Sequence, residues 1–359
     1  MMSGDVSLPL RLLRRAAAYP FLFLLSLLSW LTGRPVLVVV VPFGDLGNRL
    51  FLYANIVAFA MEHDAIVLNP AFHPWRKVFA GTRPGALACY PPPPLPFLPG
   101  GLIESIAQQL AWVGASIARA RSANSASKWA SIELKGIDRI ELDHPGFVHW
   151  ARQKHVIFLS GWLFVSTESM HTQANSLRAY FRQVLGLDQG ARAQLESLRN
   201  SCDLLVGVLI RHGDYRYFMG GKYFYETSTY IRWMRETVAL FPDRKVGFFI
   251  TGNDDRVPEG IDDLVYKFGS HSSLGTRYVL SQCDYILSPV GTYAGWAAFS
   301  GDVPLLILSS PTVPIRRESF RPIYNHIDMR DPSFPPDLDR TGELLATPRQ
   351  GRSNPRPPA

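Results

Sequence analysis

The chain has 359 residues, enough for two domains, and 47% of them are hydrophobic, so it can bury a large core and is not disordered overall. No long run of lysine and arginine lies in its interior, which argues against a nucleic-acid groove and for a membrane surface or an anionic ligand. The formal net charge is +7, with basic residues near both ends at Arg11, Arg14, Arg15, Arg34, Arg349, Arg352 and Arg356.

The cysteines Cys89, Cys202 and Cys283 are widely spaced and include no CxxC pair. An odd number of scattered cysteines predicts neither a disulfide framework nor a zinc site. Because free thiols fit a reducing compartment, we expect a cytoplasmic setting and no metal site built on cysteine.

Residues 1–35 form a segment of their own, in which LPLRLLRR precedes the uncharged run AAAYPFLFLLSLLSWLT at residues 16–32. The run is at the lower length limit of a membrane-spanning helix, and no small-x-small cleavage site follows it. Three interpretations stay open: a single-pass anchor, a helix lying in the membrane interface, and a helix packed on the protein. The short distance from the run to the next predicted strand favours interfacial association at the cytoplasmic face.

Residues 36–41 (VLVVVV) predict a strand that is buried on both faces, as central parallel strands are. Gly44 and Gly47 follow in a tight loop, and Asn48 can cap the next helix, whose apolar residues recur at helical spacing. Further strands are expected at residues 65–68 and 156–159, and helices at 102–121 and 176–185.

Residues 200–203 mark the boundary with a second lobe that repeats the alternation of strand and helix. This alternation predicts an α/β protein with two Rossmann-like lobes that face a cleft, preceded by the hydrophobic N-terminal helix. Residues 331–359 have no apolar period and predict a disordered tail. In the second lobe, strands are expected at residues 206–210, 246–251, 285–288 and 304–308, with helices at 229–241 and 277–282.

The strand at residues 206–210 ends abruptly at the polar sequence Arg211-His212-Gly213-Asp214. An open α/β sheet builds its ligand site at the carboxyl ends of its strands. Arginine suits a diphosphate, because its planar guanidinium donates two hydrogen bonds at once and stays charged. The alternative is a tight turn with a surface Arg–Asp pair.

Three stretches resemble one family in order and spacing. GDLGNRLFLYA (residues 44–54) resembles the G-x-L-G-N-Q-M-F-Q-Y-A opening of the alpha-1,2-fucosyltransferases. VGVLIRHGDY (residues 206–215) resembles their V-G-V-H-I-R-R-G-D-Y motif, which alpha-1,6-fucosyltransferases and protein O-fucosyltransferases share more loosely. YVLSQCDYILSPVGTYAGWAAF (residues 278–299) resembles their M-S-x-C-x-x-x-I-x-A-N-S-T-F-S-W-W-A-A segment.

This resemblance implies a GT-B-like fold with an acceptor lobe at residues 36–200 and a donor lobe at 201–330. It also implies GDP-fucose as the donor, inversion at the anomeric carbon, and no required metal or other cofactor. Arg211 falls on the arginine that holds the donor β-phosphate, and His212 can assist it or pack in the turn. The other positions matched to donor binding are Gly47, Asn48, Asp254, Asp255, Gly291 and Thr292.

The chain departs from the family pattern beside Arg211. The family histidine is Leu209 here, its second arginine is His212, and its Ser-Thr-Phe-Ser loop reads GTYAGW at residues 291–296. An ordinary helix cap is a second interpretation of Thr292. Another nucleotide sugar as donor, or a catalytically degenerate binding protein of the same fold, are therefore the alternatives to fucosyl transfer.

Fucosyl transfer also needs a base for the acceptor hydroxyl. Asp214 is the candidate nearest to Arg211, but a carboxylate beside an arginine has a lowered pKa, so orienting Arg211 is its favoured role. Asp45 and Glu226 are the other candidates, and the sequence does not choose among them.

Residues 215–225 (YRYFMGGKYFY) are dense in aromatic side chains and contain two glycines. Because aromatic faces suit sugar rings, we expect acceptor contacts at Tyr217, Lys222 and Tyr223; the alternative is that these side chains pack on their own lobe. The predicted partners are a nucleotide-sugar donor, a glycan or lipid-linked sugar acceptor and a membrane surface, and no nucleic acid.

Overall fold

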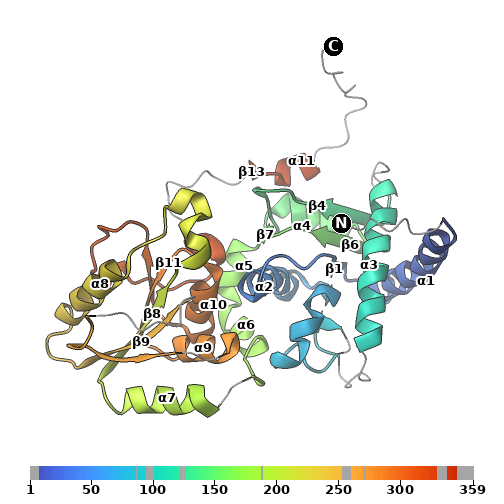
Figure 1. The fold of residues 1–359 in the computed structure, drawn as a ribbon. Coiled ribbons are helices and arrows are strands. Elements are labelled where there is room, and N and C mark those ends of the chain that lie inside the picture. The colour runs from blue at the N-terminus through green and yellow to red at the C-terminus, as the bar shows by residue number, and fades with distance from the viewer. Residues whose placement is uncertain are drawn as a thin grey trace.

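The structure is a computed structural model that describes residues 8–85, 87–93, 101–121, 124, 126–186, 189–252, 260–269, 272–329 and 338–345. They form two α/β lobes, each built on a five-stranded sheet, which lie side by side (Figure 1). Helix α2 (Leu46–His63) of the first lobe and α10 (Thr292–Gly301) of the second pack on each other between the two sheets.

The first sheet has the strand order β3-β2-β1-β6-β4, with β1 (Val36–Val39) at its centre. β1 runs parallel to both neighbours, and Val36 lies opposite Ile66 and Val156, whereas β3 is an antiparallel edge strand. The other strands are β2 (Ile66–Asn69), β3 (Ala88–Tyr90), β4 (Trp129–Glu133) and β6 (Val156–Ser160).

Strand β1 is apolar at every position because both faces of the sheet are covered. Val36 and Val38 pack with α1 (Leu8–Thr32) and α3 (Gly101–Arg121). Leu37 and Val39 point to the opposite face and pack with α2, as the two-residue period of a strand requires. The smaller helices of this lobe are η1 (Pro70–Val78), α4 (Pro145–Arg152), α5 (Thr167–Thr172) and α6 (Ala174–Tyr180).

The second sheet has the order β10-β9-β8-β11-β12, and each neighbouring pair is parallel. Val206 and Val208 of the central strand face α8, while Leu205 and Leu209 face α9 and α10. The strands of this sheet are β8 (Leu204–Ile210), β9 (Val246–Gly252), β10 (Val265–Phe268), β11 (Tyr285–Pro289) and β12 (Leu305–Leu308). Besides α10, the helices that cover it are α7 (Gln189–Arg199), α8 (Thr227–Ala239) and α9 (Ser273–Leu280).

Helix α7 belongs to the second lobe, because it packs on α9 and on β8, β9 and β10 (Figure 1). The lobe boundary expected at residues 200–203 is therefore one helix too late. The sequence of α7 has too weak an apolar pattern to show which lobe the helix packs on, since only Ala191 and Leu198 of its residues are buried.

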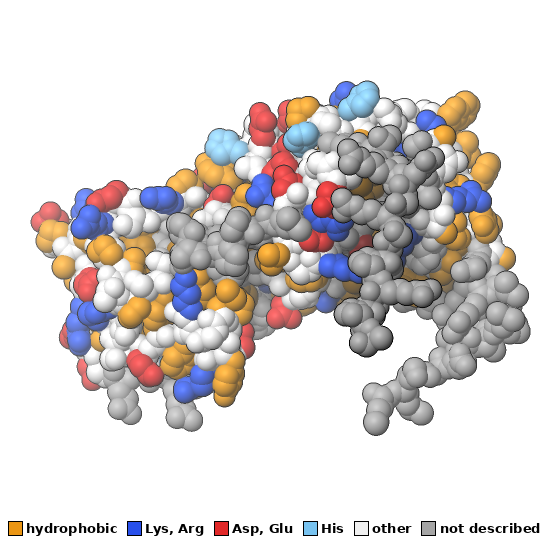
Figure 2. All heavy atoms as spheres, turned by 90° about the horizontal axis from the view of Figure 1, so that it is seen from above, with side chains coloured by type: hydrophobic (Ala, Val, Ile, Leu, Met, Phe, Trp, Pro, Cys, Tyr) orange, Lys and Arg blue, Asp and Glu red, His pale blue; other side chains and the backbone are white. Residues whose placement is uncertain are grey.

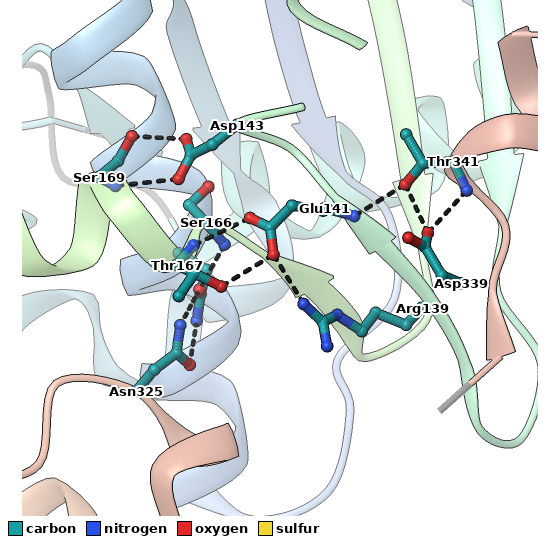
Figure 3. A network of polar contacts seen from close by, with 10 residues as sticks. Arg139, Glu141, Asp143, Ser166, Thr167, Ser169, Asn325, Asp339 and Thr341 are labelled. Atoms are coloured by element: carbon teal, nitrogen blue, oxygen red, sulfur yellow. Dashed lines mark hydrogen bonds and ion pairs between the residues drawn. The ribbon is translucent and has the colours of Figure 1, made fainter. Parts of the chain in front are cut away.

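After β12 the chain returns to the first lobe. The buried side chains of Asn55 and Asn325 exchange two hydrogen bonds, with Nδ2–Oδ1 distances of 2.7 and 3.2 Å. Figure 3 shows Asn325 in a network of polar contacts that also holds Thr341, whose Oγ1 accepts the Glu141 N–H at 3.0 Å. β13 (Leu338–Asp339) pairs with β5 (Asp138–Glu141), which pairs with β7 (Leu163–Val165), in a third, parallel sheet. The other short elements after β12 are η4 (Arg317–Ser319), which still contacts the second lobe through Arg317 and Leu240, η5 (His326–Met329) and α11 (Thr341–Leu345).

The expectation of a disordered tail at residues 331–359 is wrong for residues 338–345, which form β13 and α11. A strand of two residues carries no readable sequence pattern, and its backbone pairs with β5. The remainder of this segment lies outside the described residues.

Helix α1 packs on the first lobe through one side, where Ala18, Leu22 and Leu25 are buried. Trp129 Nε1 also donates a hydrogen bond to Ser26 Oγ at 2.8 Å. Among the described residues, no helix has both the length and the hydropathy needed to cross a bilayer, so no single-pass anchor is seen. The packed helix was one of the three interpretations, and its association with a membrane surface stays a prediction.

Candidate functional site

The carboxyl end of β8 carries a pair of opposite charges. Arg211 follows the central strand, and its Nη2 donates to both carboxylate oxygens of Asp214, at 3.1 and 3.0 Å. Asp214 lies in the 3₁₀ turn η2 (Gly213–Arg216), which turns the chain back beside the strand end. The arginine side chain is 25% exposed and the aspartate 61%. The pair can therefore be reached from solvent, with Asp214 fixing the direction of the guanidinium.

The aromatic ring of Tyr215 packs against the Arg211 side chain. The guanidinium carbon lies 4.5 Å from the centre of the Tyr215 ring, a distance typical of a cation–π contact. Burial raises the pKa of Tyr215, and the charge of Arg211 partly opposes that rise. The Nε atom of Arg211 is buried and has no hydrogen-bond partner among the described residues. Arg211 thus keeps an unused donor beside its ion pair.

The N-terminus of α10 adjoins this pair. Tyr215 Oη donates to the Val290 carbonyl, just before the helix begins. A Cβ atom at Gly291 would lie 2.9 Å from Tyr215 Oη, so a side chain at this position would collide with the tyrosine. Gly291 is the N-cap of α10 and gives it no side-chain cap, which leaves the N–H groups of the first turn available to an anion. The second interpretation of Thr292, as the cap of this helix, is therefore wrong.

The two lobes touch at the same point. Thr292 Oγ1 donates a hydrogen bond of 2.6 Å to Asn48 Oδ1, although the two residues are far apart in the sequence. A Cβ atom at Gly47 would lie 2.8 Å from Thr292 Oγ1, so the first turn of α2 approaches α10 closely only because this residue is glycine. Asn48 does not cap α2, because the N-cap residue is Asp45. The structure thus brings together two loops that the sequence placed in different lobes.

His212 is held within its own lobe. Its Nε2 donates to the Tyr225 carbonyl at 3.1 Å, and its ring lies 5.2 Å from that of Phe224. This geometry agrees with a histidine packed in the turn, which was the second of its two interpretations.

The three predicted acceptor residues lie in different surroundings. Tyr217 is 80% exposed and Lys222 is exposed, but Tyr223 is fully buried. The Tyr223 ring packs 6.3 Å from the Phe218 ring and lies under the Lys222 ammonium, so it cannot contact an acceptor in this conformation. Some aromatic residues of this segment therefore pack on their own lobe and others are exposed. The prediction that Tyr223 contacts the acceptor is wrong.

The first lobe contributes an aromatic pair that the sequence analysis did not predict as a site. The rings of Phe43 and Trp162 are stacked, with centroids 5.5 Å apart and planes 3° from parallel. Each residue follows a neighbouring parallel strand, β1 or β6, and Phe43 is 39% exposed. The signal available in the sequence was that both aromatic residues stand just beyond the carboxyl ends of predicted buried strands.

The carboxylates proposed as bases differ in their surroundings. Asp45 and Glu226 are exposed N-cap residues of α2 and α8, and neither side chain caps its helix. Asp254 and Asp255, predicted to contact the nucleoside, lie outside the described residues. Across the described part of the chain, no three His, Cys, Asp or Glu side chains gather as metal ligands.

Comparison with known proteins supports the fold. No model of a known protein family matches the chain, and neither does any curated protein sequence. A solved structure of an Arabidopsis thaliana FUT1 mutant in complex with GDP is similar, with a TM-score of 0.52 and 12% identity over 79% of this chain and 73% of that one. At this identity the likeness establishes the fold, an α/β arrangement of parallel sheets.

Two further solved structures give lower scores. They are POFUT1 in complex with GDP-fucose, with a TM-score of 0.45 and 11% identity over 76% of this chain and 95% of that one, and fucosyltransferase NodZ from Bradyrhizobium, with 0.44 and 14% over 78% and 97%. We draw no conclusion about this protein from TM-scores this low.

Proposed function

We propose that the protein is an inverting glycosyltransferase that moves fucose from GDP-fucose to a hydroxyl group of a glycan or lipid-linked sugar. The observation that carries this proposal is the position of Arg211, at the carboxyl end of the central parallel strand and beside the open N-terminus of α10. The FUT1 structure that shares the fold holds GDP, which supports a guanosine diphosphate as the leaving group.

In the proposed reaction, the bond between the anomeric carbon and the β-phosphate oxygen breaks. The acceptor oxygen bonds to the opposite face of that carbon, which inverts its configuration. Negative charge develops on the departing diphosphate, where Arg211 and the first-turn N–H groups of α10 donate hydrogen bonds. Because these groups can neutralise that charge, we propose that no divalent cation is required.

Other residues of the donor site have supporting roles in this proposal. Asn48 and Thr292 join the lobes at the phosphate end of the donor. Gly47 and Gly291 allow the close approach of the backbone there. Asp254 and Asp255 are proposed to bind the nucleoside.

For the general base we propose Asp45. It is exposed, it comes from the lobe opposite Arg211, and it stands two residues before Gly47, which touches Thr292. Asp214 is less suitable as a base, because its two hydrogen bonds from Arg211 stabilise the charged carboxylate. Orienting Arg211 is therefore the proposed role of Asp214.

We propose that the stacked rings of Phe43 and Trp162 support the acceptor sugar from the first lobe. Tyr217 and Lys222, which are exposed beyond η2, are proposed to approach the acceptor from the second lobe. Phe43, Trp162 and Tyr217 are aromatic, and a flat ring can pack its apolar face against the C–H groups of a sugar.

Calorimetric titration with GDP-fucose, GDP-mannose and a UDP-sugar tests the nucleotide specificity. We expect GDP-fucose to bind and to release GDP when a glycan acceptor is added. Preference for another nucleotide would favour the first alternative function, a transferase of a different sugar. Binding of GDP-fucose without hydrolysis or transfer would favour the second, a binding protein of the same fold.

Treatment with EDTA tests the proposed independence from metal. We expect full turnover after chelation and dialysis, because the Arg211 guanidinium and the first-turn N–H groups of α10 stabilise the negative charge of the diphosphate. A strict requirement for added Mn²⁺ or Mg²⁺ would contradict this part of the proposal while leaving the donor specificity intact.

We also propose that α1 attaches the protein to the cytoplasmic surface of a membrane. Its side away from the protein exposes a row of large apolar residues, and apolar side chains are visible at that end of the molecule in Figure 2. A basic sequence precedes them, so the segment suits an anionic membrane. The exposed apolar residues are Tyr19, Phe23, Leu24, Leu27, Trp30 and Leu31.

Flotation with phosphatidylcholine vesicles, with and without phosphatidylglycerol, tests this attachment. The wild type is expected to float with the anionic vesicles, and Trp30→Glu is expected to remain in solution. Ile137→Glu is the matched control, because Ile137 is also exposed but lies in the turn between β4 and β5. Equal flotation of the wild type and Trp30→Glu would contradict the proposal.

A further inference from the structure

A cavity of about 380 Å³ lies on the seam between the lobes, away from the residues of the proposed donor site. Its first-lobe wall comes from α6 and the segment after it, and its second-lobe wall comes from α9 and α10. The polar and charged residues that line it are Arg178, Arg182, Gln183, Arg277, Tyr278, Ser281, Gln282 and Ser300. No Asp or Glu is among the lining residues.

Arg277 is the most unusual residue of this cavity. It is 3% exposed, and its Nε, Nη1 and Nη2 atoms are all buried without a hydrogen-bond partner among the described residues. The centre of the Tyr293 ring lies 5.5 Å from the guanidinium carbon. Burial lowers the pKa of Arg277 to about 10, so the side chain is still charged at neutral pH. A buried charge without a counterion is strongly unfavourable.

Two further arginines and a glutamine amide bring more hydrogen-bond donors to the cavity wall. Gln183 Nε2 is buried and has no partner among the described residues. Arg182 is exposed at the cavity wall. Arg178 is already engaged, because it donates to Asp302 Oδ1 at 2.5 Å and to the Phe299 carbonyl at 2.8 Å. Unused donors from both lobes therefore face a space without a carboxylate.

The cavity is distinct from the proposed donor site. None of its lining residues is among those assigned to the donor, and Trp296 and Ser300 lie one and two turns beyond Thr292 along α10. With a rise of 1.5 Å per residue, these positions are about 6 and 12 Å from the N-terminus of that helix. Arg277 itself approaches α10 at its first turn, beside the Tyr293 ring. An anion bound to it would thus lie along the side of α10, whereas the donor diphosphate is proposed to lie at the N–H groups of its end.

We propose that this cavity is a second anion site, which binds a phosphate group against Arg277 and Gln183. The group is either inorganic phosphate or the phosphate of a larger ligand, because the guanidinium and the amide offer the same donors to both. Because the walls come from both lobes, an occupant stabilises the lobes in the arrangement described here. The inference does not depend on the proposed fucosyl transfer.

Thermal melts with increasing inorganic phosphate, at constant ionic strength set by chloride, test the proposal. The melting temperature of the wild type is expected to rise and saturate, as it does when a ligand binds only the folded state. In Arg277→Leu the apparent phosphate affinity is expected to fall about tenfold or more, and in Gln183→Leu a few-fold. Gln183→Leu serves as the second variant if Arg277→Leu does not fold.

Arg211→Ala is the control that separates the two sites. It is expected to keep the full response to phosphate and to lose the response to GDP, which would assign the nucleotide diphosphate to Arg211 and the phosphate group to the cavity. Full retention of GDP binding in Arg211→Ala, with its loss in Arg277→Leu, would instead make a nucleotide the source of the bound phosphate group.

Three results would overturn the proposal. The first is a wild type that shows no saturable response to phosphate. The second is an equal response in the wild type, Arg277→Leu and Gln183→Leu. The third is a phosphate response that disappears in Arg211→Ala but persists in Arg277→Leu, which would place the anion at the donor site.

Discussion

Two arginines near helix α10 hold their charge in different ways. Arg211, at the end of β8, keeps a quarter of its side chain exposed and shares its charge with Asp214. Arg277, on α9, is 3% exposed and has no hydrogen-bond partner within the described part of the chain. An exposed ion pair contributes little to stability, whereas a buried unpaired cation costs much.

The two arginines therefore differ in what a ligand does for them: Arg211 is proposed to bind a ligand but is stable without one, whereas Arg277 is stabilised only when an anion is bound. Arg211 is stable without an occupant, so its loss should change binding and turnover but hardly the fold. Arg277 has no protein counterion, so its replacement should change stability and the response to anions.

The largest effect is expected for Arg211→Ala. We predict a decrease in kcat/KM of about 10³-fold or more, because the variant loses both a diphosphate contact and stabilisation of the charge that develops on it. Turnover is measured as GDP released from GDP-fucose in the presence of a glycan acceptor. The melting temperature should hardly change, and wild-type turnover in this variant would contradict the assignment of Arg211.

The next largest effect is expected for Asp45→Asn. As general base, Asp45 should contribute about 10²-fold or more to kcat, while the affinity for GDP should be that of the wild type. Glu226→Gln is the matched control, because Glu226 is also an exposed N-cap residue and is not proposed as the base. If Glu226→Gln lost turnover and Asp45→Asn did not, the base would have to be reassigned.

A stability effect is expected for Arg277→Leu in buffers without phosphate or sulfate. Removal of the buried, uncompensated charge should raise the free energy of unfolding by about 1–4 kcal/mol, the range seen when buried ionic groups are replaced by apolar ones. Denaturant titration measures the change. The matched control is Arg235→Leu, since Arg235 is exposed and paired with Asp263, and its change should be close to zero. A destabilised Arg277→Leu would show that the arginine is compensated within the protein.

The smallest effect is expected at the contact between the lobes. A double-mutant cycle with Asn48→Ala and Thr292→Val should give a coupling energy of about 0.5–1.5 kcal/mol in the unfolding free energy, the value of one hydrogen bond. Additive effects of the two substitutions would mean that the two side chains do not interact in solution.

Seven of the ten strands in the two main sheets could be predicted because each is a run of largely buried apolar residues. β1 and β8 are the clearest examples, since alternate residues of each pack with helices on opposite sides. The edge strands β3, β4 and β10 could not be predicted, because most of their residues are not buried. Strands β5, β7 and β13 were missed because they are two to four residues long and depend on pairing that is distant in the sequence. Likewise, α7 shows too few apolar residues to be assigned to the second lobe from its sequence.

The candidate site could be predicted in part. The resemblance assigned the loops at Gly47–Asn48 and Gly291–Thr292 to one donor site, and the contact of Asn48 with Thr292 agrees with that assignment. The burial of Tyr223 could not be predicted, because a tyrosine next to glycines has the same sequence pattern whether its ring points inward or outward. The isolation of Arg277 also could not be predicted from the sequence, since it depends on the absence of Asp and Glu among the cavity-lining residues, which come from segments far apart in the chain.

The most direct test of the central claim, that Arg211 binds the β-phosphate of the donor nucleotide, compares GDP with GMP. Calorimetry on the wild type and on Arg211→Ala gives four affinities, from which the contribution of the β-phosphate follows in each protein. We predict that the wild type binds GDP about 10- to 100-fold more tightly than GMP, and that this ratio is several-fold smaller in Arg211→Ala, where only the N–H groups of α10 still donate to the β-phosphate. An equal GDP-to-GMP ratio in the two proteins would contradict the claim.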